Sequence, residues 1–221
     1  MKQKRIGVVL SGCGVYDGAE IHEAVLTLFF LARSGAEAVV MAPDMTQHHV
    51  INHLTGEVMA ESRNVLIESA RIARGKIRDL ARVGVDDLDG IILPGGFGAA
   101  KNLSSIAFDG PKARVDDSLA KLLRGMHAAG KPIGALCISP ALLARVFHDR
   151  GITLTIGSDA DTAGAIRAMG NAHQESGVEE IVVDASNRVI TSPAYMCAAG
   201  IAEVGLGIEK LVSRLLSLVG S

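Results

Sequence analysis

Short apolar segments that end in turns rich in glycine or proline recur along the chain, and they constrain its fold more than any other feature. They are residues 5–10, 38–42, 90–93 and 132–136. Runs of this length and character are typical of strands buried in a parallel sheet, because both faces of such a strand are covered. Hydrophobic residues make up 48% of the chain, which is enough to build a core with helices on both faces of the sheet.

Helical periodicity separates these strands. The predicted helices are residues 20–34, 64–74, 115–129, 140–147, 160–169 and 196–219. Gly35 and Gly130 stand where glycines that end helices are expected. Ser139 followed by Pro140 is a helix-start signal, with the serine as N-cap. Strands and helices that alternate in this order favour right-handed crossover connections.

The remaining segments complete the predicted fold. We expect an edge strand at 153–156, a β-hairpin at 181–190 that turns at Ser186-Asn187, and an insertion at about 44–89. The sum is a single domain over residues 1–221: a flavodoxin-like, doubly wound, mostly parallel sheet with helices on both faces, plus a C-terminal β-hairpin. Functional sites in such folds gather at the carboxyl ends of the strands.

Charge and hydropathy exclude two classes of partner. The net charge is −2 at pH 7 and no long run of Lys or Arg occurs, so we expect no nucleic-acid partner. The longest apolar stretches, such as 24–32, are shorter than the roughly 20 residues that span a bilayer, so we expect no membrane association. The basic residues 1–5 run directly into the first strand and do not resemble a signal segment, which points to a cytoplasmic protein.

Cys137 is the first candidate for chemistry, because it lies between a short strand and the start of a helix. A helix dipole and exposed amides at this position favour thiolate, so we expect its pKa to be lowered. The alternative is a small residue packed in the core, as most free cysteines are. Gly95 and Gly96 follow another strand, and their N–H groups could stabilise an oxyanion together with that of Ile138; the alternative is an ordinary turn.

The other cysteines and the histidines carry weaker signals. Cys13, at the end of the first strand, either lines the same crevice as Cys137 or packs as a small residue, and Cys197 is expected to be structural. The wide spacing of the three cysteines fits neither a disulfide framework nor a zinc site. A loose histidine cluster lacks the spacing of metal ligands and is expected to be a solvated loop. Its members are His48, His49 and His53. We predict no metal and no other cofactor.

Three segments together resemble a known family. They are Gly18-Ala-Glu-Ile-His-Glu23, Leu93-Pro-Gly-Gly-Phe-Gly-Ala-Ala-Lys-Asn-Leu103 and Gly134-Ala-Leu-Cys-Ile-Ser-Pro-Ala141, which are similar to the PfpI branch of the class I glutamine-amidotransferase-like superfamily. Further segments resemble the ElbB group within it, described as isoprenoid-biosynthesis glyoxalases. These are Ser11-Gly-Cys-Gly-Val-Tyr-Asp-Gly18, Asn52-His-Leu-Thr-Gly-Glu57, Arg63-Asn-Val-Leu-Ile-Glu68 and Thr191-Ser-Pro-Ala-Tyr-Met196. The resemblance covers essentially the whole chain.

The resemblance implies a role for several residues. Cys137 matches the nucleophile, and Glu23 matches the acidic residue that faces it from the first helix. Gly96 and Ile138 match the positions whose amides form the oxyanion hole. Further residues are expected to line the pocket, namely Cys13, Gly95 and Asn102. If burial keeps Glu23 partly protonated, its carboxyl group can hydrogen-bond the thiolate and exchange a proton with substrate. A homodimer is also implied.

The chain departs from the superfamily pattern at the histidine. Peptidase-like and amidotransferase relatives have a histidine directly after the cysteine or farther along the chain, whereas Ile138 follows Cys137 and the loop around 157–158 has none. A Cys–His triad is therefore not predicted, nor is hydrolysis of peptides or glutamine. His173 is the nearest downstream candidate, with an exposed loop histidine as the alternative. His22 adjoins Glu23, but adjacent helix residues point about 100° apart, so both cannot face one cysteine equally.

Two functions remain open at this point. The first, implied by the ElbB resemblance, is a weak, cofactor-independent glyoxalase that converts a 2-oxoaldehyde such as methylglyoxal or glyoxal to a 2-hydroxy acid through a thiohemiacetal on Cys137. The second is a thiol sensor or partner-binding protein that uses the same Cys137 crevice without turnover. The missing histidine favours the second, and the whole-chain resemblance favours the first.

Overall fold

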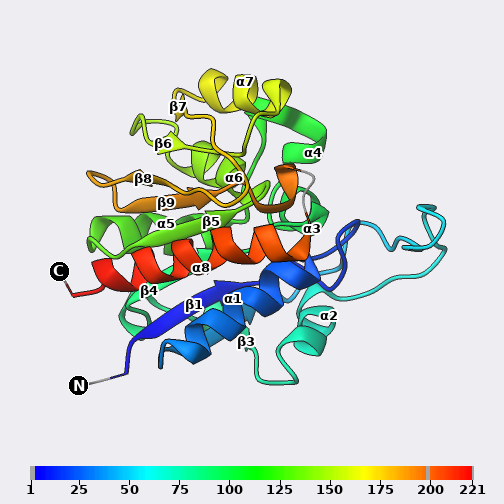
Figure 1. Cartoon of the computed structure of the whole chain (residues 1–221). Coiled ribbons are helices and arrows are strands. Elements are labelled where there is room, and N and C mark those ends of the chain that lie inside the picture. The colour runs from blue at the N-terminus through cyan, green and yellow to red at the C-terminus, as the bar shows by residue number, and fades with distance from the viewer. Residues whose placement is uncertain (1–2, 198–199, 221) are drawn as a thin grey trace.

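A computed structural model describes residues 3–197 and 200–220 (Figure 1). Its central sheet has seven strands in the order β3-β2-β1-β4-β5-β9-β8. They are β1 (Arg5–Val9), β2 (Glu37–Ala42), β3 (Arg78–Asp79), β4 (Gly90–Leu93), β5 (Ile133–Leu136), β8 (Val182–Asp184) and β9 (Val189–Ser192). All neighbouring pairs are parallel except β8 with β9. The predicted flavodoxin-like, mostly parallel sheet is confirmed.

Helices cover both faces of this sheet. Successive residues of a strand point to opposite sides, and because the buried strands are largely apolar, each side has a core that a helix must cover. Val8 and Ile92 belong to the core under α1 (Ile21–Arg33), α2 (Val65–Ile72) and α8 (Ile201–Leu218). Val9 and Ile91 belong to the core under the helices of the other face. These are α3 (Phe97–Lys101), α5 (Asp117–Ala128), α6 (Ser139–Val146) and α7 (Ala160–Ala168). The short helix α4 (Ile106–Asp109) follows α3.

Two predicted segments take a different place in the sheet. The expected insertion at 44–89 contains α2 and β3, and β3 pairs in parallel with β2, so its second half extends the main sheet. The strand expected at the sheet edge, 153–156, is instead β6 (Thr153–Leu154), which pairs with β7 (Ala172–His173) in a separate two-stranded sheet. The β8–β9 hairpin already occupies that edge, because β9 pairs with β5.

The starts of two helices also differ from the prediction. Ser139 is not an N-cap: it is the first residue of α6, and its hydroxyl donates to the Pro94 carbonyl at 2.7 Å. The last helix begins at Ile201 and not at Met196, since residues up to Cys197 form the 3₁₀ turn η4 (Ala194–Cys197). Residues 198–199, which fall within the predicted helix, lie outside the described residues. Within the described ranges, no helix is long and apolar enough to cross a membrane.

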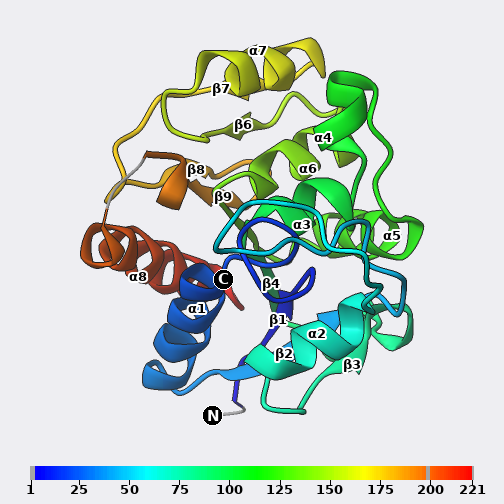
Figure 2. The same ribbon diagram turned by 90° about the vertical axis from the view of Figure 1, so that its right-hand side faces the viewer.

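The carboxyl ends of β1, β4 and β5 lie together at one edge of the sheet, as the predicted topology requires (Figure 2). Figure 2 looks onto this edge, where the chain from β2 to α2 crosses in front of β1 and β4. Three turns meet here: the one between β1 and α1, the one between β4 and α3, and the one between β5 and α6. The candidate site is built from these turns.

Candidate functional site

Cys137 occupies a sharp turn between β5 and α6. Its φ of 59° lies in the left-handed region, which is uncommon and strained for any residue other than glycine. Two hydrogen bonds hold the turn: the Cys137 N–H donates to the Ser192 carbonyl at 3.0 Å, and the Ser139 hydroxyl ties the start of α6 to Pro94. Strain that persists because its surroundings enforce it is typical of functional sites. The elbow predicted for Cys137 is present.

Glu23 lies beside Cys137 and is completely buried. The Glu20 carboxylate accepts the Glu23 N–H at 2.7 Å, so Glu20 caps α1 and the first helical turn carries Glu23 inward. Its carboxyl oxygens accept the Gly95 N–H at 2.8 Å and the Tyr195 N–H at 3.4 Å. The carboxyl group also hydrogen-bonds with the Cys137 thiol. A buried carboxyl with these partners is fixed in orientation.

Burial controls the ionisation of this pair. It raises the pKa of Glu23 to about 8, and the nearby charge of Glu20 acts in the same direction. Hydrogen bonds from Gly95, Cys137 and Tyr195 oppose the increase without reversing it. Glu23 is therefore mostly protonated at neutral pH, which agrees with the expected protonated carboxyl.

The expectation of a lowered pKa for Cys137 is wrong. Burial, followed by the negative charge of Glu23, raises the pKa of the thiol well above its usual range. The backbone N–H groups of Gly96 and Ile138 donate toward the sulfur and lower the pKa, as predicted for an amide pair at this position, but they are outweighed. The side chain is only 8% exposed, so desolvation of the thiolate exceeds the stabilisation from the helix dipole.

The two glycines after β4 are required by close packing. A Cβ on Gly95 would lie 2.5 Å from the Cys137 Cβ and 2.9 Å from a Glu23 carboxyl oxygen. Gly96 has a φ of +94°, and a Cβ there would lie 2.4 Å from the Glu20 nitrogen. Glycine at 95 therefore lets the turn contact the thiol and the carboxyl group directly, and glycine at 96 lets it pack against the backbone of residues 18–20. The structure brings together Cys137, Glu23 and the amides of residues 95, 96 and 138.

Asn102, expected to line the pocket, has a structural role. It is buried, and its amide nitrogen donates to the carbonyls of Ser11 at 2.8 Å and Asp17 at 3.0 Å. Its carbonyl oxygen accepts the His48 N–H at 2.8 Å. Every polar atom of the side chain thus holds the turn after β1 or the segment after β2, so Asn102 clamps the backbone and offers nothing to a substrate.

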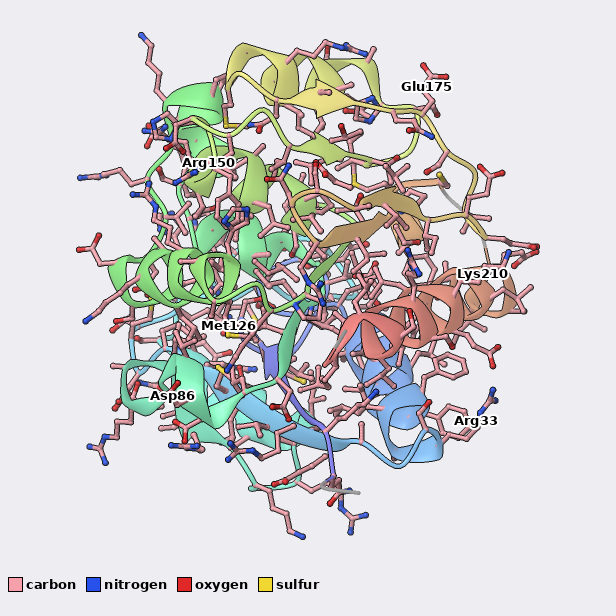
Figure 3. The ribbon with its side chains drawn as sticks, turned by 90° about the vertical axis from the view of Figure 1, so that its left-hand side faces the viewer. Arg33, Asp86, Met126, Arg150, Glu175 and Lys210 are labelled. Carbon is pink, nitrogen blue, oxygen red and sulfur yellow. The ribbon has the colours of Figure 1, made fainter. Side chains whose placement is uncertain are left out.

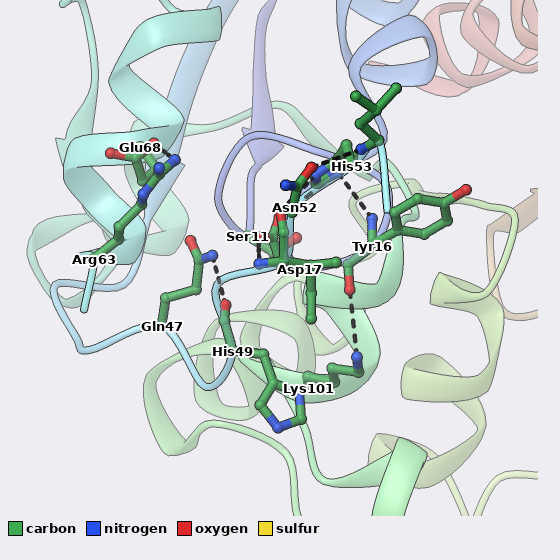
Figure 4. A network of polar contacts seen from close by, with 12 residues as sticks. Ser11, Tyr16, Asp17, Gln47, His49, Asn52, His53, Arg63, Glu68 and Lys101 are labelled. Carbon is green, nitrogen blue, oxygen red and sulfur yellow. Dashed lines mark hydrogen bonds and ion pairs between the residues drawn. The ribbon is translucent and has the colours of Figure 1, made fainter. Parts of the chain in front are cut away.

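Cys13 is half-buried in the turn after β1 and has surroundings of its own. Burial raises its pKa, and the nearest charged groups are Glu68, Arg71, Asp17 and Arg63. Figure 4 shows Arg63 next to the buried Glu68, with Asp17 on the opposite side of Ser11. Glu68, Arg71 and Arg63 lie in or just before α2, and Asp17 lies in the turn after β1. The Glu23 carboxyl is not among these groups, so Cys13 has an environment distinct from that of Cys137.

The histidines do not complete a triad with Cys137. His173 lies in β7, where its Nε2 accepts the Ile156 N–H at 3.3 Å and burial lowers its pKa. His53 accepts the Tyr16 N–H at 3.2 Å (Figure 4), and His48 stacks on Phe108. In the part of the chain that the structure describes, no three His, Cys, Asp or Glu side chains gather as a metal site would require.

Tyr195 is a site residue that the sequence did not single out. Its N–H reaches the Glu23 carboxyl, and its hydroxyl pairs with His22 Nδ1 at 2.7 Å. It belongs to η4, directly after β9, and β9 lies beside β5 in the sheet. The hairpin at 181–190 was predicted, but its place in the sheet was not. A place next to β5 would have indicated that the residues after β9 lie at the edge of the sheet where Cys137 follows β5.

The fold and the site define a class of protein: a flavodoxin-like α/β protein with a cysteine on a strained elbow and a buried glutamate against its thiol. The chain belongs to the DJ-1/PfpI family, whose model matches residues 13–199. The predicted resemblance to the PfpI branch and to the amidotransferase-like fold is thereby confirmed.

Individual relatives match almost the entire chain. A human protein named glutamine amidotransferase-like class 1 domain-containing protein 3, mitochondrial, is 49% identical over 98% of this chain and 84% of its own length. The rat ES1 protein homolog, mitochondrial, is 48% identical over the same shares. The solved structure of an isoprenoid biosynthesis protein with an amidotransferase-like domain from Ehrlichia chaffeensis has a TM-score of 0.90 and 36% identity, covering 96% of this chain and 99% of that one.

A more distant structure shares the fold alone. Drosophila melanogaster DJ-1beta has a TM-score of 0.58 at 18% identity and covers 98% of this chain and 96% of its own. The relatives also correct one expectation. A cytoplasmic location conflicts with the human and rat proteins, both mitochondrial by name at nearly half identity, so that expectation is wrong. The expectation of a cytoplasmic location rested on residues 1–5, which run directly into the first strand. That pattern predicts local structure but not the cellular compartment of the protein.

Proposed function

We propose that this protein is a cofactor-independent glyoxalase of the ElbB type, which converts methylglyoxal or glyoxal to the corresponding 2-hydroxy acid. The observation that carries the proposal is the contact between the Cys137 thiol and the buried Glu23 carboxyl, with two amides directed at the sulfur. This arrangement combines a nucleophile, a group that can exchange protons near neutral pH, and donors for an oxyanion. The DJ-1/PfpI family includes both glyoxalases and redox sensors.

The first step joins Cys137 to the aldehyde. The ionised Glu23 carboxylate accepts the thiol proton while the sulfur forms a bond to the aldehyde carbon. The carbonyl electron pair moves to the oxygen, where the amides of Gly96 and Ile138 stabilise the charge. Return of the proton from Glu23 to this oxygen gives a neutral thiohemiacetal. The C–S bond is the only new bond between protein and substrate.

The second step is an internal redox reaction. Glu23 removes the hydrogen of the former aldehyde carbon as a proton, and the electron pair of that C–H bond forms a carbon–carbon double bond while the neighbouring carbonyl oxygen takes up a proton, which gives an enediol. A proton is then delivered to the neighbouring carbon, and the hydroxyl group of the first carbon loses its proton to become the thioester carbonyl. The first carbon is thereby oxidised to a thioester of Cys137, and the second is reduced to an alcohol. Water then breaks the C–S bond, releasing the 2-hydroxy acid and restoring the thiol. One water is consumed, and no external oxidant or reductant is needed.

The depth of the site limits the substrate. Cys137 is 8% exposed and Glu23 is completely buried, so only a compact aldehyde can bring its carbonyl carbon to the sulfur. Two- and three-carbon 2-oxoaldehydes meet this condition. A thiol with a raised pKa is rarely ionised and needs a reactive partner. The carbonyl groups of these aldehydes are strongly electrophilic and therefore suit such a thiol. The reaction should nevertheless be slow, because Glu23 serves both proton transfers without a histidine.

The test is turnover of methylglyoxal by purified protein, measured as lactate formed in the presence of a chelator. Wild-type protein and Cys13→Ser should form lactate at similar rates, and Cys137→Ser should form none above the uncatalysed background. Cys13→Ser is the matched control because it removes an accessible thiol from a different environment. Equal turnover by Cys137→Ser and wild type would rule out the thiol mechanism.

A thiol sensor is the second candidate, favoured by the absence of a histidine from the groups that contact Cys137. Under this alternative, stoichiometric peroxide would oxidise Cys137 to the sulfenic or sulfinic acid, and methylglyoxal would not be turned over. Peptide mass mapping after peroxide, performed beside the lactate assay, separates the two functions. Lactate formation that is lost in Cys137→Ser identifies the enzyme. Selective Cys137 oxidation with no lactate identifies the sensor.

A second copy of the chain is the partner that we propose, in a homodimer. Ile21, Val25 and Phe29 follow one another at four-residue spacing on α1 and are 41%, 46% and 52% exposed. Such a stripe of apolar side chains on one helix face favours burial in an interface. Phe29→Glu should therefore produce a monomer in light scattering, whereas a wild-type protein that is itself monomeric would exclude the homodimer.

A further inference from the structure

Basic residues line a cavity on the face of the sheet opposite α1 and α8. The cavity lies at the C-terminal end of α6, whereas Cys137 precedes the N-terminal end of that helix. It has a volume of about 550 Å³ and lies between the first half of α5 and the C-terminal end of α6. Four permanently charged cations line it, together with His148 and a single carboxylate, Asp117. The cations are Arg114, Lys121, Arg124 and Arg145. This concentration of positive charge contrasts with a chain whose net charge is −2.

The cavity continues into a second recess along α5. Arg124 and Val146 line both, and the second recess adds His127 and Arg150. Figure 3 looks onto this side of the molecule, where Arg150 is labelled above α5. Arg150 already has an acidic partner, since its Nε lies 3.6 Å from an Asp149 carboxylate oxygen. The first cavity therefore holds the greater excess of unpaired positive charge.

No acidic side chain neutralises the four cations of the first cavity. Among the described residues, none of the four has a carboxylate oxygen within 4.0 Å, whereas several arginines elsewhere do have an acidic partner, as Arg63 does in Glu61. Like charges that gather around a concave surface repel one another in the empty site. An anion that enters relieves this repulsion, and its binding is favoured by the field of all four groups.

Two of the arginines are held in place by the backbone. Arg124 donates to the Val146 carbonyl at 3.2 Å, and Arg145 donates to the Ala113 carbonyl through Nε. A guanidinium has five N–H donors, so each keeps donors for a ligand while one is used to fix its position. Planar arginine donors suit phosphate oxygens, which accept two parallel hydrogen bonds. Anchoring reduces the entropy lost when a ligand binds.

The walls of the cavity determine what the anion carries. Val115 and Ala120, both partly exposed, lie among the cations, so part of the lining is apolar. A volume of about 550 Å³ is within the range of small-molecule sites and exceeds what a free phosphate would fill. We propose that this cavity binds a small organic phosphate, with the phosphate groups on the arginines and lysine and the organic part against the apolar wall.

Binding can be tested by calorimetry with pyrophosphate and ADP as probes. Arg114 and Lys121 are exposed and their side chains make no hydrogen bonds in the described structure, so Arg114→Gln and Lys121→Gln should fold normally. Each should weaken binding of both probes by about tenfold, since each removes a charge-assisted hydrogen bond. Lys112→Gln is the matched control, because Lys112 is exposed and only two residues before Arg114 but does not line the cavity.

A substitution that is expected to strengthen binding, not weaken it, makes the test more specific. Asp117→Asn removes the one carboxylate that faces the bound anion and should tighten binding of pyrophosphate several-fold. ADP should bind at least as tightly as pyrophosphate and compete with it, because the apolar wall accepts the organic part.

Three results would overturn the proposal. The first is no saturable binding of either probe at millimolar concentration. The second is an equal loss of affinity in Lys112→Gln. The third is a polyglutamate peptide that binds while neither phosphate probe competes, which would indicate an acidic protein segment as the ligand.

Discussion

The carboxyl group of Glu23 and the thiol of Cys137 share a hydrogen bond in the protein interior, and the Gly95 backbone touches both. Two acidic groups in such contact cannot both ionise near neutral pH, because burial and mutual repulsion disfavour a second negative charge. Glu23 loses its proton first, at a pKa of about 8, and its charge then opposes ionisation of the thiol. The pair therefore carries a movable proton in the range where most enzymes work.

The raised pKa of Glu23 predicts how stability depends on pH. The ordinary value is 4.5 and the folded value is about 8, so between these limits the folded state binds more protons than the unfolded state. The stabilisation is fully present below 4.5 and is lost as pH rises toward 8. Relative to Glu23→Gln, the free energy of unfolding of wild type should decrease by about 1.4 kcal/mol per pH unit between pH 5 and 7.5.

Chemical denaturation of both proteins across this range measures the difference directly. Glu23→Gln also loses a hydrogen bond, but that cost does not vary with pH and cancels from the slope. Glu203→Gln is the control on the protein surface and should follow wild type. A constant difference between wild type and Glu23→Gln would mean that Glu23 is ionised in the folded protein at neutral pH.

The same pKa predicts the pH dependence of activity. Glu23 accepts the thiol proton only as a carboxylate, so kcat/KM for methylglyoxal should rise about tenfold per unit below pH 8 and level off above it. Glu23→Gln should lack this inflection. Initial rates of lactate formation from pH 5.5 to 9 measure the profile. Activity that declines between pH 6 and 8 would require a protonated Glu23 in the first step, contrary to the proposed role.

Gly95→Ala should damage the site with little effect on the rest of the fold. The added Cβ would lie 2.5 Å from the Cys137 Cβ, so the thiol or the turn must move. A displacement of this kind is expected to reduce kcat/KM about a hundredfold and to cost about 1–3 kcal/mol of stability. Gly84→Ala is the matched control, since its Cβ would meet nothing nearer than 3.8 Å. Equal activity of both variants would show that the Gly95 contact is unimportant.

Asn102→Ala should reduce stability by at least about 2 kcal/mol, because the Ser11 and Asp17 carbonyls lose their buried donor. Asn52→Ala, in the segment between β2 and α2, is the comparison. Within the described structure its side chain accepts a single hydrogen bond, from the Leu54 N–H, so the change should stay within about 1 kcal/mol. Urea denaturation measures both. If Asn102→Ala is as stable as Asn52→Ala but inactive, Asn102 lines the substrate site after all.

The parts of the fold that the sequence predicted are those set by local patterns. Four short apolar runs became the central strands, and the periodicity of residues 20–34 became α1. Placement across the sheet was harder. Residues 78–79 are too short and too charged to be recognised as a strand, yet they pair with β2. The edge beside β5 could not be assigned before the hairpin was placed there.

For the candidate site, too, the features set by local sequence were predicted from it, and those set by contacts between distant segments were not. The elbow at Cys137 follows from the strand and helix that flank it, whereas the pairing with Glu23 came from the family resemblance. The direction of the thiol pKa was missed because burial depends on contacts from several distant segments, including the glutamate of α1. Tyr195 was missed for a related reason: its contact with Glu23 is made by the backbone and leaves no trace in the residue type.

The most direct test of the central claim is the intact mass of the protein after methylglyoxal is added and the reaction is quenched in acid. The proposed mechanism predicts that Glu23→Gln slowly accumulates the mass of one methylglyoxal on Cys137. Water can take the thiol proton in the reversible addition, but without the carboxylate nothing removes the hydrogen of the former aldehyde carbon. Wild type should accumulate less adduct and release lactate, and Cys137→Ser should carry none at this position. An adduct on Glu23→Gln that maps to Cys13 or Cys197, with lactate still formed, would contradict the assignment of Cys137 and Glu23 as the catalytic pair.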